Sequence, residues 1–436
     1  MVDLPTSPIT EMRLRNLRRF EDTGDLKLSA INFIFGKNSS GKTTLLRAPL
    51  LLKQLVNERS LAGGVPFAGP YVDFGSYPEA VHNSERSRDI HLSFEVDFPP
   101  AARRIPRGLL EHLRPFEKIR FEVTLHWNAT KGQAQFNRIL IIDHRRTRRI
   151  ADLKRLGPDR IRVEIPPASL NRTVQGASEL TFATLSSLPL ELDYSERGGT
   201  PIAELLLYTM WNVLSSAVRK IVHIGPLRDM PERAYRIDQL STSSGSTEHV
   251  VGMLVSHTDA VAPVSRALKS LGIAKQVEIV QPAPGYAGVF LSDLDSNRRD
   301  NLADVGFGAS QVLPILVRLA LAPRDSLILV EQPELHLHPE VQGQLAEVMI
   351  DLALARGFSI LVESHSENML LRLRRLVASG SLDPSAVRIF VSDKGAVRAA
   401  EIDSKGRLDM SAFPAGFFEE EWEEAMGIMQ GGANRA

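Results

Sequence analysis

Apolar residues are arranged in two different ways along this chain. Near both ends they form short, mostly apolar runs over residues 30–35, 326–330 and 359–362, the pattern of strands buried on both faces. The first run is followed by leucines that recur at helical spacing from Leu45 to Leu55. Both ends of the chain are therefore predicted to place polar loops after buried strands.

The middle of the chain alternates apolar and polar residues instead. This alternation, together with a high content of β-branched residues, predicts an antiparallel β region. Its expected strands are residues 90–98, 119–127, 133–142 and 161–165. Further along, the apolar spacing predicts helices at 201–222 and 260–271, strands at 277–280 and 287–291, and a hairpin of 387–391 and 396–402.

A glycine-bounded loop joins the first apolar run to the leucine-rich helix. It matches G-x-x-x-x-G-K-[ST] at every fixed position, which is the phosphate-binding P-loop pattern. The glycines let successive N–H groups surround an anion, and the lysine adds a charge near the β- and γ-phosphates. We predict that ATP binds here with Mg²⁺, and that Thr43 is a metal ligand. The expected nucleotide-binding residues are Gly36, Lys37, Asn38, Ser39, Ser40, Gly41, Lys42, Thr43 and Thr44.

Two further strand ends carry polar residues suited to the same site. Residues 326–330 end in Glu331, Gln332 and Glu334, and the carboxyl end of a parallel strand is where such sheets bind ligands. This is the pattern of a Walker B strand, so Glu331 is predicted to hold the magnesium shell. His365 follows the next buried strand, where an imidazole can hydrogen-bond a γ-phosphate oxygen.

A second glycine-containing loop precedes the Walker B strand. Gly306, Gly308 and Ser310 open a helix, which predicts a second anion-binding element. One chain cannot easily fold both loops onto one triphosphate. We therefore expect a composite site, in which this loop faces a nucleotide held by a partner subunit.

Composition and charge narrow the remaining choices. Lys+Arg and Asp+Glu are both 52, so no global charge indicates nucleic acid or membrane. A basic run from Arg145 to Arg155 could follow a phosphate backbone, but without interleaved aromatic residues a solvated strand edge is the preferred interpretation. The absence of cysteine agrees with a reducing compartment, and no apolar signal core or 18-residue apolar stretch occurs. The protein is expected to be cytoplasmic, with no membrane contact.

The order of these motifs resembles an ABC-type ATPase head. Within that class the chain is similar to AAA-family ATPases akin to the OLD (overcoming lysogenization defect) proteins and to ATPase subunits of bacterial anti-phage systems. Only about seventy residues follow His365, too few for the Toprim nuclease domain of OLD proteins that cut DNA. The similarity is carried by residues 36–43, 224–228, 305–314, 331–339, 363–367 and 413–418.

The resemblance implies an α/β fold with a mixed central sheet, flanking helices, and an antiparallel β-rich and helical insertion. It also implies that the Gly306–Ser310 loop closes over the partner's γ-phosphate, that Leu335–His338 crosses the dimer interface, and that His365 is the switch histidine. Arg19 and Phe20 lie where such heads contact the base. The expected parts are residues 1–98 (first part of the head, with the P-loop), 99–200 (β-rich insertion), 201–300 (helical lobe and connecting strands) and 301–436 (Gly306 loop, Walker B, histidine, hairpin and tail).

The chain departs from the ABC pattern at one position. ABC ATPases carry a catalytic glutamate after the Walker B acid, and here that position is Gln332. Glutamine cannot accept a proton from the attacking water as a carboxylate does, although it can orient the water. We expect slow hydrolysis, unless Glu334 reaches the water, so that Glu331, Gln332, Glu334 and His365 form the candidate catalytic set.

The resulting expectation is an ATP-driven switch subunit. Two chains would close around ATP, either as a dimer or within a larger assembly, and would control a partner effector such as a nuclease encoded elsewhere, with the anti-phage role implied by resemblance alone. Two alternatives stay open at this point. One is a DNA-repair or chromosome-maintenance ATPase that acts on DNA through the Arg145–Arg155 run, and the other is a scaffold that binds ATP without hydrolysing it.

Overall fold

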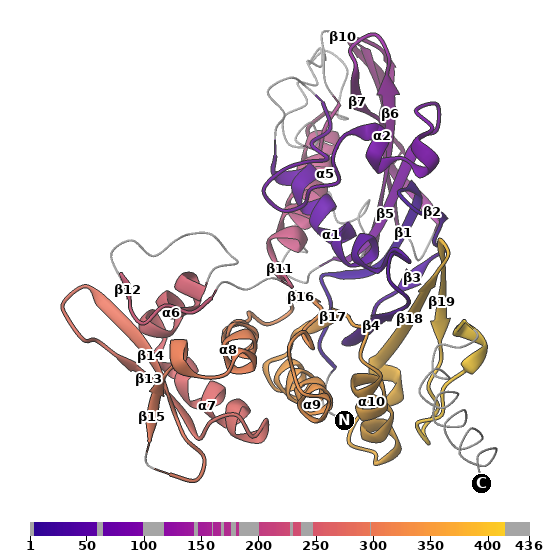
Figure 1. Cartoon of the computed structure of the whole chain (residues 1–436). Coiled ribbons are helices and arrows are strands. Elements are labelled where there is room, and N and C mark those ends of the chain that lie inside the picture. The colour runs from indigo at the N-terminus through magenta and orange to yellow at the C-terminus, as the bar shows by residue number, and fades with distance from the viewer. Residues whose placement is uncertain are drawn as a thin grey trace.

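A computed structural model of the 436-residue chain shows how these segments assemble. It describes residues 4–58, 64–98, 117–143, 147–158, 160–166, 170–175, 180–182, 200–226, 230–236, 247–296 and 298–414. Three sheets organise this part of the chain (Figure 1).

The first sheet brings the two ends of the chain together. Its strand order is β11 (Ile221–Ile224), β16 (Leu327–Glu331), β17 (Ser359–Glu363), β4 (Ile31–Phe35), β18 (Val387–Asp393) and β19 (Ala396–Ala400). All neighbours are parallel except β18 and β19, which pair as an antiparallel hairpin at the predicted place. Every residue of β4, β16 and β17 is buried. The carboxyl ends of these three strands therefore meet at one edge of the sheet.

Helices cover this sheet and continue from its strands. The helix α1 (Lys42–Asn57) contacts β4, β11, β16 and β17, while α9 (Pro339–Arg356) contacts β17 and packs against α10 (Glu367–Ala378). The helix α5 (Thr200–Arg219) packs on α1 and ends just before β11. The predicted mixed α/β fold class is confirmed. Among the described helices, none combines the length and the apolar character needed to span a bilayer.

The second sheet is antiparallel and rises above the first (Figure 1). Alternate residues of its strands are buried, as in Lys118–Asn128, because one face packs on α1 and α5 while the other carries polar side chains. Its order is β10 (Leu170–Gln175), β9 (Arg160–Ile165), β8 (Arg148–Gly157), β7 (Gln133–Asp143), β6 (Lys118–Asn128), β5 (Ile90–Asp97), β1 (Ile9–Leu17) and β2 (Phe20–Asp22), with β3 (Leu26–Lys27) also paired to β1.

The basic segment, interpreted from the sequence as a solvated strand edge, forms β8, which is paired on both sides by β7 and β9 and is not an edge strand. Ile150, Ala151 and Leu153 are fully buried there, but the arginines around them obscure the alternation in the sequence. The pairing also shifts register between Ile141 and Ile142, and again between Arg155 and Gly157. Such bulges break the simple period of two by which a strand is recognised.

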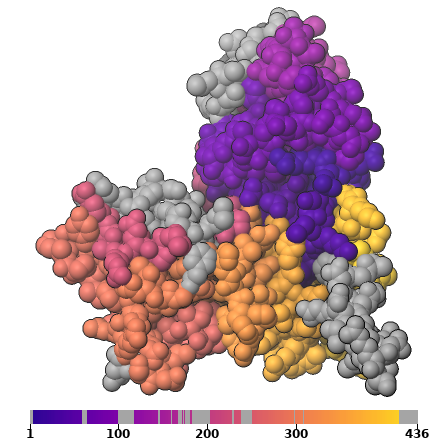
Figure 2. All heavy atoms as spheres, viewed as in Figure 1, coloured from indigo at the N-terminus to yellow at the C-terminus, as the bar shows by residue number. Residues whose placement is uncertain are grey.

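The third sheet and three helices form a smaller lobe. It holds β12 (Tyr235–Arg236), β14 (Tyr286–Ser292), β13 (Gln276–Val280) and β15 (Arg299–Asn301), together with α6 (Thr247–Ser256), α7 (Val261–Ser270) and α8 (Phe307–Ala320). In the space-filling view this lobe lies at the lower left, below the antiparallel sheet and beside α9 (Figure 2). Short helical segments remain at α2 (Tyr77–Ala80) and at His82–Ser84, Thr258–Ala260, Leu302–Asp304, Pro384–Ala386 and Met410–Ala412.

Candidate nucleotide-binding site

The P-loop joins β4 to α1 through two glycines that no other residue could replace without strain. Gly36 and Gly41 have φ of +150° and +110°. A Cβ atom on Gly36 would lie 2.2 Å from the carbonyl oxygen of Ser392, and one on Gly41 would lie 2.5 Å from the ring of Phe20. The loop is thus pressed between β18 and the β1–β2 hairpin, which holds its backbone at the N-terminus of α1.

Lys42 crosses back over the loop that precedes it. Its Nζ donates hydrogen bonds of 2.8 Å to the carbonyl oxygens of both Gly36 and Lys37. The side chain is 3% exposed, and this burial lowers the pKa of its ammonium group. The charge is held at the mouth of the loop, where the sequence motif predicts phosphates.

Glu363, at the end of β17, is the carboxylate that contacts the predicted metal ligand Thr43. The Thr43 hydroxyl donates a 2.8 Å hydrogen bond to Glu363 Oε1. Glu363 is 2% exposed, and its Oε2 has no hydrogen-bond partner among the described residues. The pKa of Glu363 is raised to about 7. Burial is the main cause and the nearby charge of Glu331 adds to it, while the hydrogen bond from Thr43 opposes the rise. Sequence reasoning gave this strand-end residue no role.

Glu331, at the end of the neighbouring strand β16, is engaged elsewhere. Arg47 of α1 donates two hydrogen bonds to its carboxylate, at 2.6 and 2.7 Å, and His223 Nε2 of β11 lies 2.7 Å from Oε1. Burial would raise the pKa of Glu331, but the hydrogen bonds from His223 and Arg47 outweigh burial and hold the pKa below its usual range. The predicted Walker B acid is therefore bound by an arginine and a histidine, neither of which was anticipated.

The other candidate catalytic residues are divided between the pocket and the interior. Gln332 and His365 line the pocket, and burial together with the charge of Lys42 lowers the pKa of His365 to about 4. Glu334 is 7% exposed and does not line the pocket. Its Oε1 accepts a 2.6 Å hydrogen bond from the backbone N–H of His365, and burial raises its pKa. Glu334 supports the histidine loop from behind.

These groups surround one polar pocket of about 480 Å³. Residues from the β1–β2 turn and from the segment after α2 complete its wall, and sequence reasoning found only Arg19 among them. Phe20, the other residue expected near the base, is fully buried against Gly41. Arg18, Asn83 and Ser84 have positive φ, so their positions depend on turns that leave no clear pattern in the sequence. The additional wall residues are Arg18, Arg19, Glu79, Val81, Asn83 and Ser84.

The second glycine loop lies outside this pocket. Gly306 precedes α8. A Cβ atom added to Gly308 would lie 3.3 Å from Leu337 Cδ2, so the loop packs beside the Leu335–His338 segment. Ser310 is 1% exposed, which covers its hydroxyl within the chain. Within one chain, therefore, Gly306, Gly308 and Ser310 are not brought to the P-loop.

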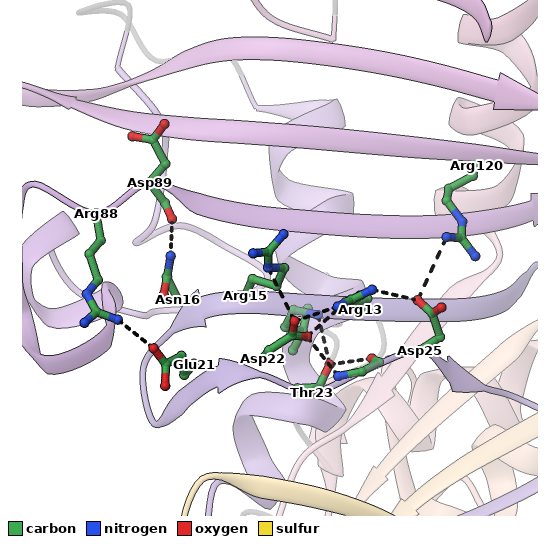
Figure 3. Close-up of polar contacts among 12 residues, drawn as sticks. Arg13, Arg15, Asn16, Glu21, Asp22, Thr23, Asp25, Arg88, Asp89 and Arg120 are labelled. Carbon is green, nitrogen blue, oxygen red and sulfur yellow. Dashed lines mark hydrogen bonds and ion pairs between the residues drawn. The ribbon is translucent and has the colours of Figure 1, made fainter.

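The arginines of the antiparallel sheet are matched by carboxylates. In Figure 3, Arg13 and Arg15 of β1 approach Asp22 of β2, at 2.6 and 3.4 Å, while Arg120 of β6 reaches Asp25 at 3.9 Å. The same arrangement continues along the sheet, where Arg149 lies 3.3 Å from Glu164. In the described part of the basic run, Arg149 thus lies beside the carboxylates of Asp152 and Glu164.

Some predicted features lie outside the described residues. They are Arg145 and Arg146 of the basic run, Leu227 and Arg228 of the 224–228 segment, and residues 415–418 of the tail.

The sequence model of one protein family matches residues 31–371; its description reads "AAA domain, putative AbiEii toxin, Type IV TA system". None of the curated proteins compared with the chain matches it.

Three solved structures that match this chain are all SMC head domains. An SMC head bound to the C-winged helix domain of ScpA has 12% identity and a TM-score of 0.44, and the match covers 91% of this chain and 98% of that chain. The SMC head domain from Thermotoga maritima has 12% identity and a TM-score of 0.38, with coverage of 91% and 99%. An Smc head with an extended coiled coil, bound to the C-terminal domain of ScpA derived from Pyrococcus furiosus, has 10% identity and a TM-score of 0.40, with coverage of 98% and 99%.

Proposed function

Since the chain belongs to the AAA-domain family whose sequence model spans residues 31–371, we propose that it is an ATP-binding switch subunit that hydrolyses ATP slowly. Membership of the AAA family agrees with the P-loop prediction, whereas the OLD-like identity stays a prediction. The observation that carries the proposal is the polar pocket in which the P-loop, Gln332, Glu363 and His365 meet. ATP would place its phosphates against Lys42 and the first N–H groups of α1.

The residues of this pocket fit a magnesium ion. Magnesium prefers oxygen ligands, and here the Thr43 hydroxyl lies beside a carboxylate whose Oε2 is buried without a partner among the described residues. We propose that Thr43 and Glu363 hold the ion directly or through water. When bound, the ion would neutralise charge on the phosphate oxygens. Glu331 would join them only by leaving Arg47.

Slow hydrolysis is supported by where the carboxylates lie. Gln332 occupies the pocket, while Glu334 is buried behind the His365 loop with its Oε1 hydrogen-bonded to the backbone. Gln332 can hold a water through its amide but cannot take up the proton. Glu363 lines the pocket with a pKa of about 7, which suits a group that accepts a proton near neutrality, although its contact with Thr43 favours the metal role.

A composite site between two chains is supported by the separation of the two glycine loops. The Gly306 loop is outside the pocket of its own chain, and the position of a Cβ on Gly306 would meet nothing within 4 Å. We propose that Gly306 and Gly308, rather than the covered Ser310, would approach the nucleotide of a second copy. The closed dimer would then hold or release a protein effector such as a nuclease, in anti-phage defence. The effector and the defence role rest on the sequence resemblance alone.

The test is ATP turnover by the purified chain. We expect slow turnover in the wild type, an increase of about 100-fold in Gln332→Glu, and little change in Glu334→Gln. Lys42→Ala serves as the control that loses nucleotide binding. Fast wild-type turnover that is unaffected by Glu334→Gln would refute both the slow-switch mechanism and the rescue by Glu334. No turnover in either wild type or Gln332→Glu, with ATP still bound, would favour the non-hydrolysing scaffold.

A further inference from the structure

A second cavity of about 330 Å³ lies between the first sheet and the smaller lobe. Its wall is made by α1, the segment around Tyr71, β11, α6 and the C-terminal end of α8. Among the described residues it shares no lining residue with the nucleotide pocket. Its volume lies within the range of sites that bind small molecules.

The charged residues that line this cavity are all of one sign. Lys53, Arg219 and Arg318 contribute to its wall beside the imidazole of His223, and no aspartate or glutamate does so among the described residues. Surfaces elsewhere on the molecule pair arginines with carboxylates, as in Figure 3. A one-signed lining that is partly enclosed attracts an oppositely charged ligand.

Arg318 is the most informative of these residues. Its side chain is 7% exposed, one nitrogen (Nη1) donates a 3.3 Å hydrogen bond to the carbonyl oxygen of His223, and Nη2 is buried with no partner among the described residues. Burial lowers the pKa of this guanidinium group. A buried cation without a counter-charge is costly, so an arginine in this position is expected to meet an anion in at least one functional state.

The rest of the wall is apolar and includes one aromatic ring. Leu50, Met253 and Leu321 line it together with Tyr71. Lys53 Nζ lies 5.0 Å from the centre of the Tyr71 ring and donates a 2.7 Å hydrogen bond to the carbonyl oxygen of Ile221. A ligand that filled this space would need an apolar or flat body as well as a charged group.

We propose that this cavity binds a small organic anion, whose carboxylate or phosphate forms an ion pair with the guanidinium of Arg318 and whose body lies against Tyr71 and Leu50. The planar guanidinium of an arginine such as Arg318 can donate two parallel hydrogen bonds to a carboxylate or a phosphate. Arg219, which is exposed at the rim, adds a second charge at the entrance.

A series of contacts leads from the cavity through His223 to Glu331, which precedes the pocket residue Gln332. Arg318 holds the backbone of His223, and the imidazole of His223 contacts Glu331, which in turn binds Arg47. The cavity also has α6 and α8 on one side and α1 and β11 on the other. A ligand bound in the cavity would therefore change the contacts that hold Glu331 and the packing of the smaller lobe against the first sheet. Through these changes it would regulate the proposed ATP site.

Binding is tested by calorimetry on the nucleotide-free full chain, with benzoate as the carboxylate probe and phenyl phosphate as the phosphate probe. We expect saturable binding of at least one probe, and an affinity loss of about tenfold or more in Arg318→Met. Lys42→Ala should retain the binding, which separates this cavity from the P-loop. Arg266→Met, which changes an exposed arginine on α7, is the matched control and should also retain it.

Three outcomes would overturn the proposal: no binding of either probe, binding that Arg318→Met leaves intact, or binding that is lost in Lys42→Ala. If Arg318→Met does not fold, Arg219→Met and Lys53→Met must each weaken the probe by several-fold, and an unchanged affinity in both would overturn it. These measurements use no nucleotide, so they succeed or fail independently of ATP turnover. The regulatory role is then tested by the change in ATP affinity at saturating probe, where no change contradicts the connection through His223.

Discussion

The ends of β16 and β17 carry the same side chain at paired positions, yet in opposite surroundings. Glu331 and Glu363 are register partners and are both about 2% exposed. Glu331 is bound by Arg47 and His223 and has a lowered pKa, whereas the carboxylate of Glu363 accepts a hydrogen bond from the Thr43 hydroxyl and has a pKa raised to about 7. Burial alone thus does not decide the state of a carboxylate, because the neighbouring helix and strand supply or withhold its counter-charges.

The strongest way to break this contrast is to remove the partner of Glu331. Arg47→Ala leaves a buried carboxylate with His223 alone, and we expect the free energy of unfolding to fall by about 3 kcal/mol. Urea denaturation measures this loss. Arg13→Ala, which breaks the exposed pair with Asp22, is the control and should cost no more than about 1 kcal/mol. Equal losses in the two variants would mean that Glu331 is not held as described.

The second experiment tests which of the two carboxylates, Glu331 or Glu363, contributes to Mg²⁺ binding. We expect Glu363→Gln to raise the Mg²⁺ concentration needed for half-maximal ATP binding by about 10- to 100-fold, because it removes the acid beside Thr43. Glu331→Gln should change this concentration less. Titration of Mg²⁺ with a fluorescent ATP analogue measures both. The reverse order would restore the role that the Walker B pattern predicts for Glu331.

The raised pKa of Glu363 predicts a pH dependence of stability. Its folded-state pKa of about 7 exceeds its ordinary value of 4.5, so the folded chain binds more protons between these values. The contribution of Glu363 to stability should therefore be largest below about pH 4.5 and should be lost as the pH rises to about 7, a loss of roughly 3 kcal/mol for this group. Glu363→Gln, which mimics the protonated acid, should remove that part of the decline in denaturation curves at pH 5 and pH 8. A decline of the same size in the variant would assign it to other groups.

The smallest effect is expected on the antiparallel sheet, where the carboxylates are paired at the surface. Arg148→Ala combined with Arg149→Ala should change stability by less than about 1 kcal/mol, because Arg149 and Glu164 form an exposed pair. It should also leave duplex DNA binding unchanged in a filter assay with salt titration. Steep salt-dependent binding that this variant loses would instead support the DNA-acting alternative.

Much of the fold followed from local patterns. The strands β4, β16 and β17 were predicted because they are short, mostly apolar runs, and β5, β6 and β7 because they alternate. The strand β8 was expected at an edge of the sheet and lies inside it, because two bulges and its arginines hide the alternation of a half-buried strand. The P-loop was recognised because Gly36 and Gly41 must adopt angles that other residues avoid.

The chain's own order of residues was enough to place the glycine loops and the polar groups at the strand ends, because backbone requirements and hydrophobic period act over a few neighbouring positions. Which residues these polar groups contact was decided only by the tertiary structure. Arg47 meets Glu331 across 284 positions and Thr43 meets Glu363 across 320, and no local pattern encodes either pair. The same holds for the cavity at Arg318, whose walls come from five separate segments that become neighbours only when the lobe packs against the head.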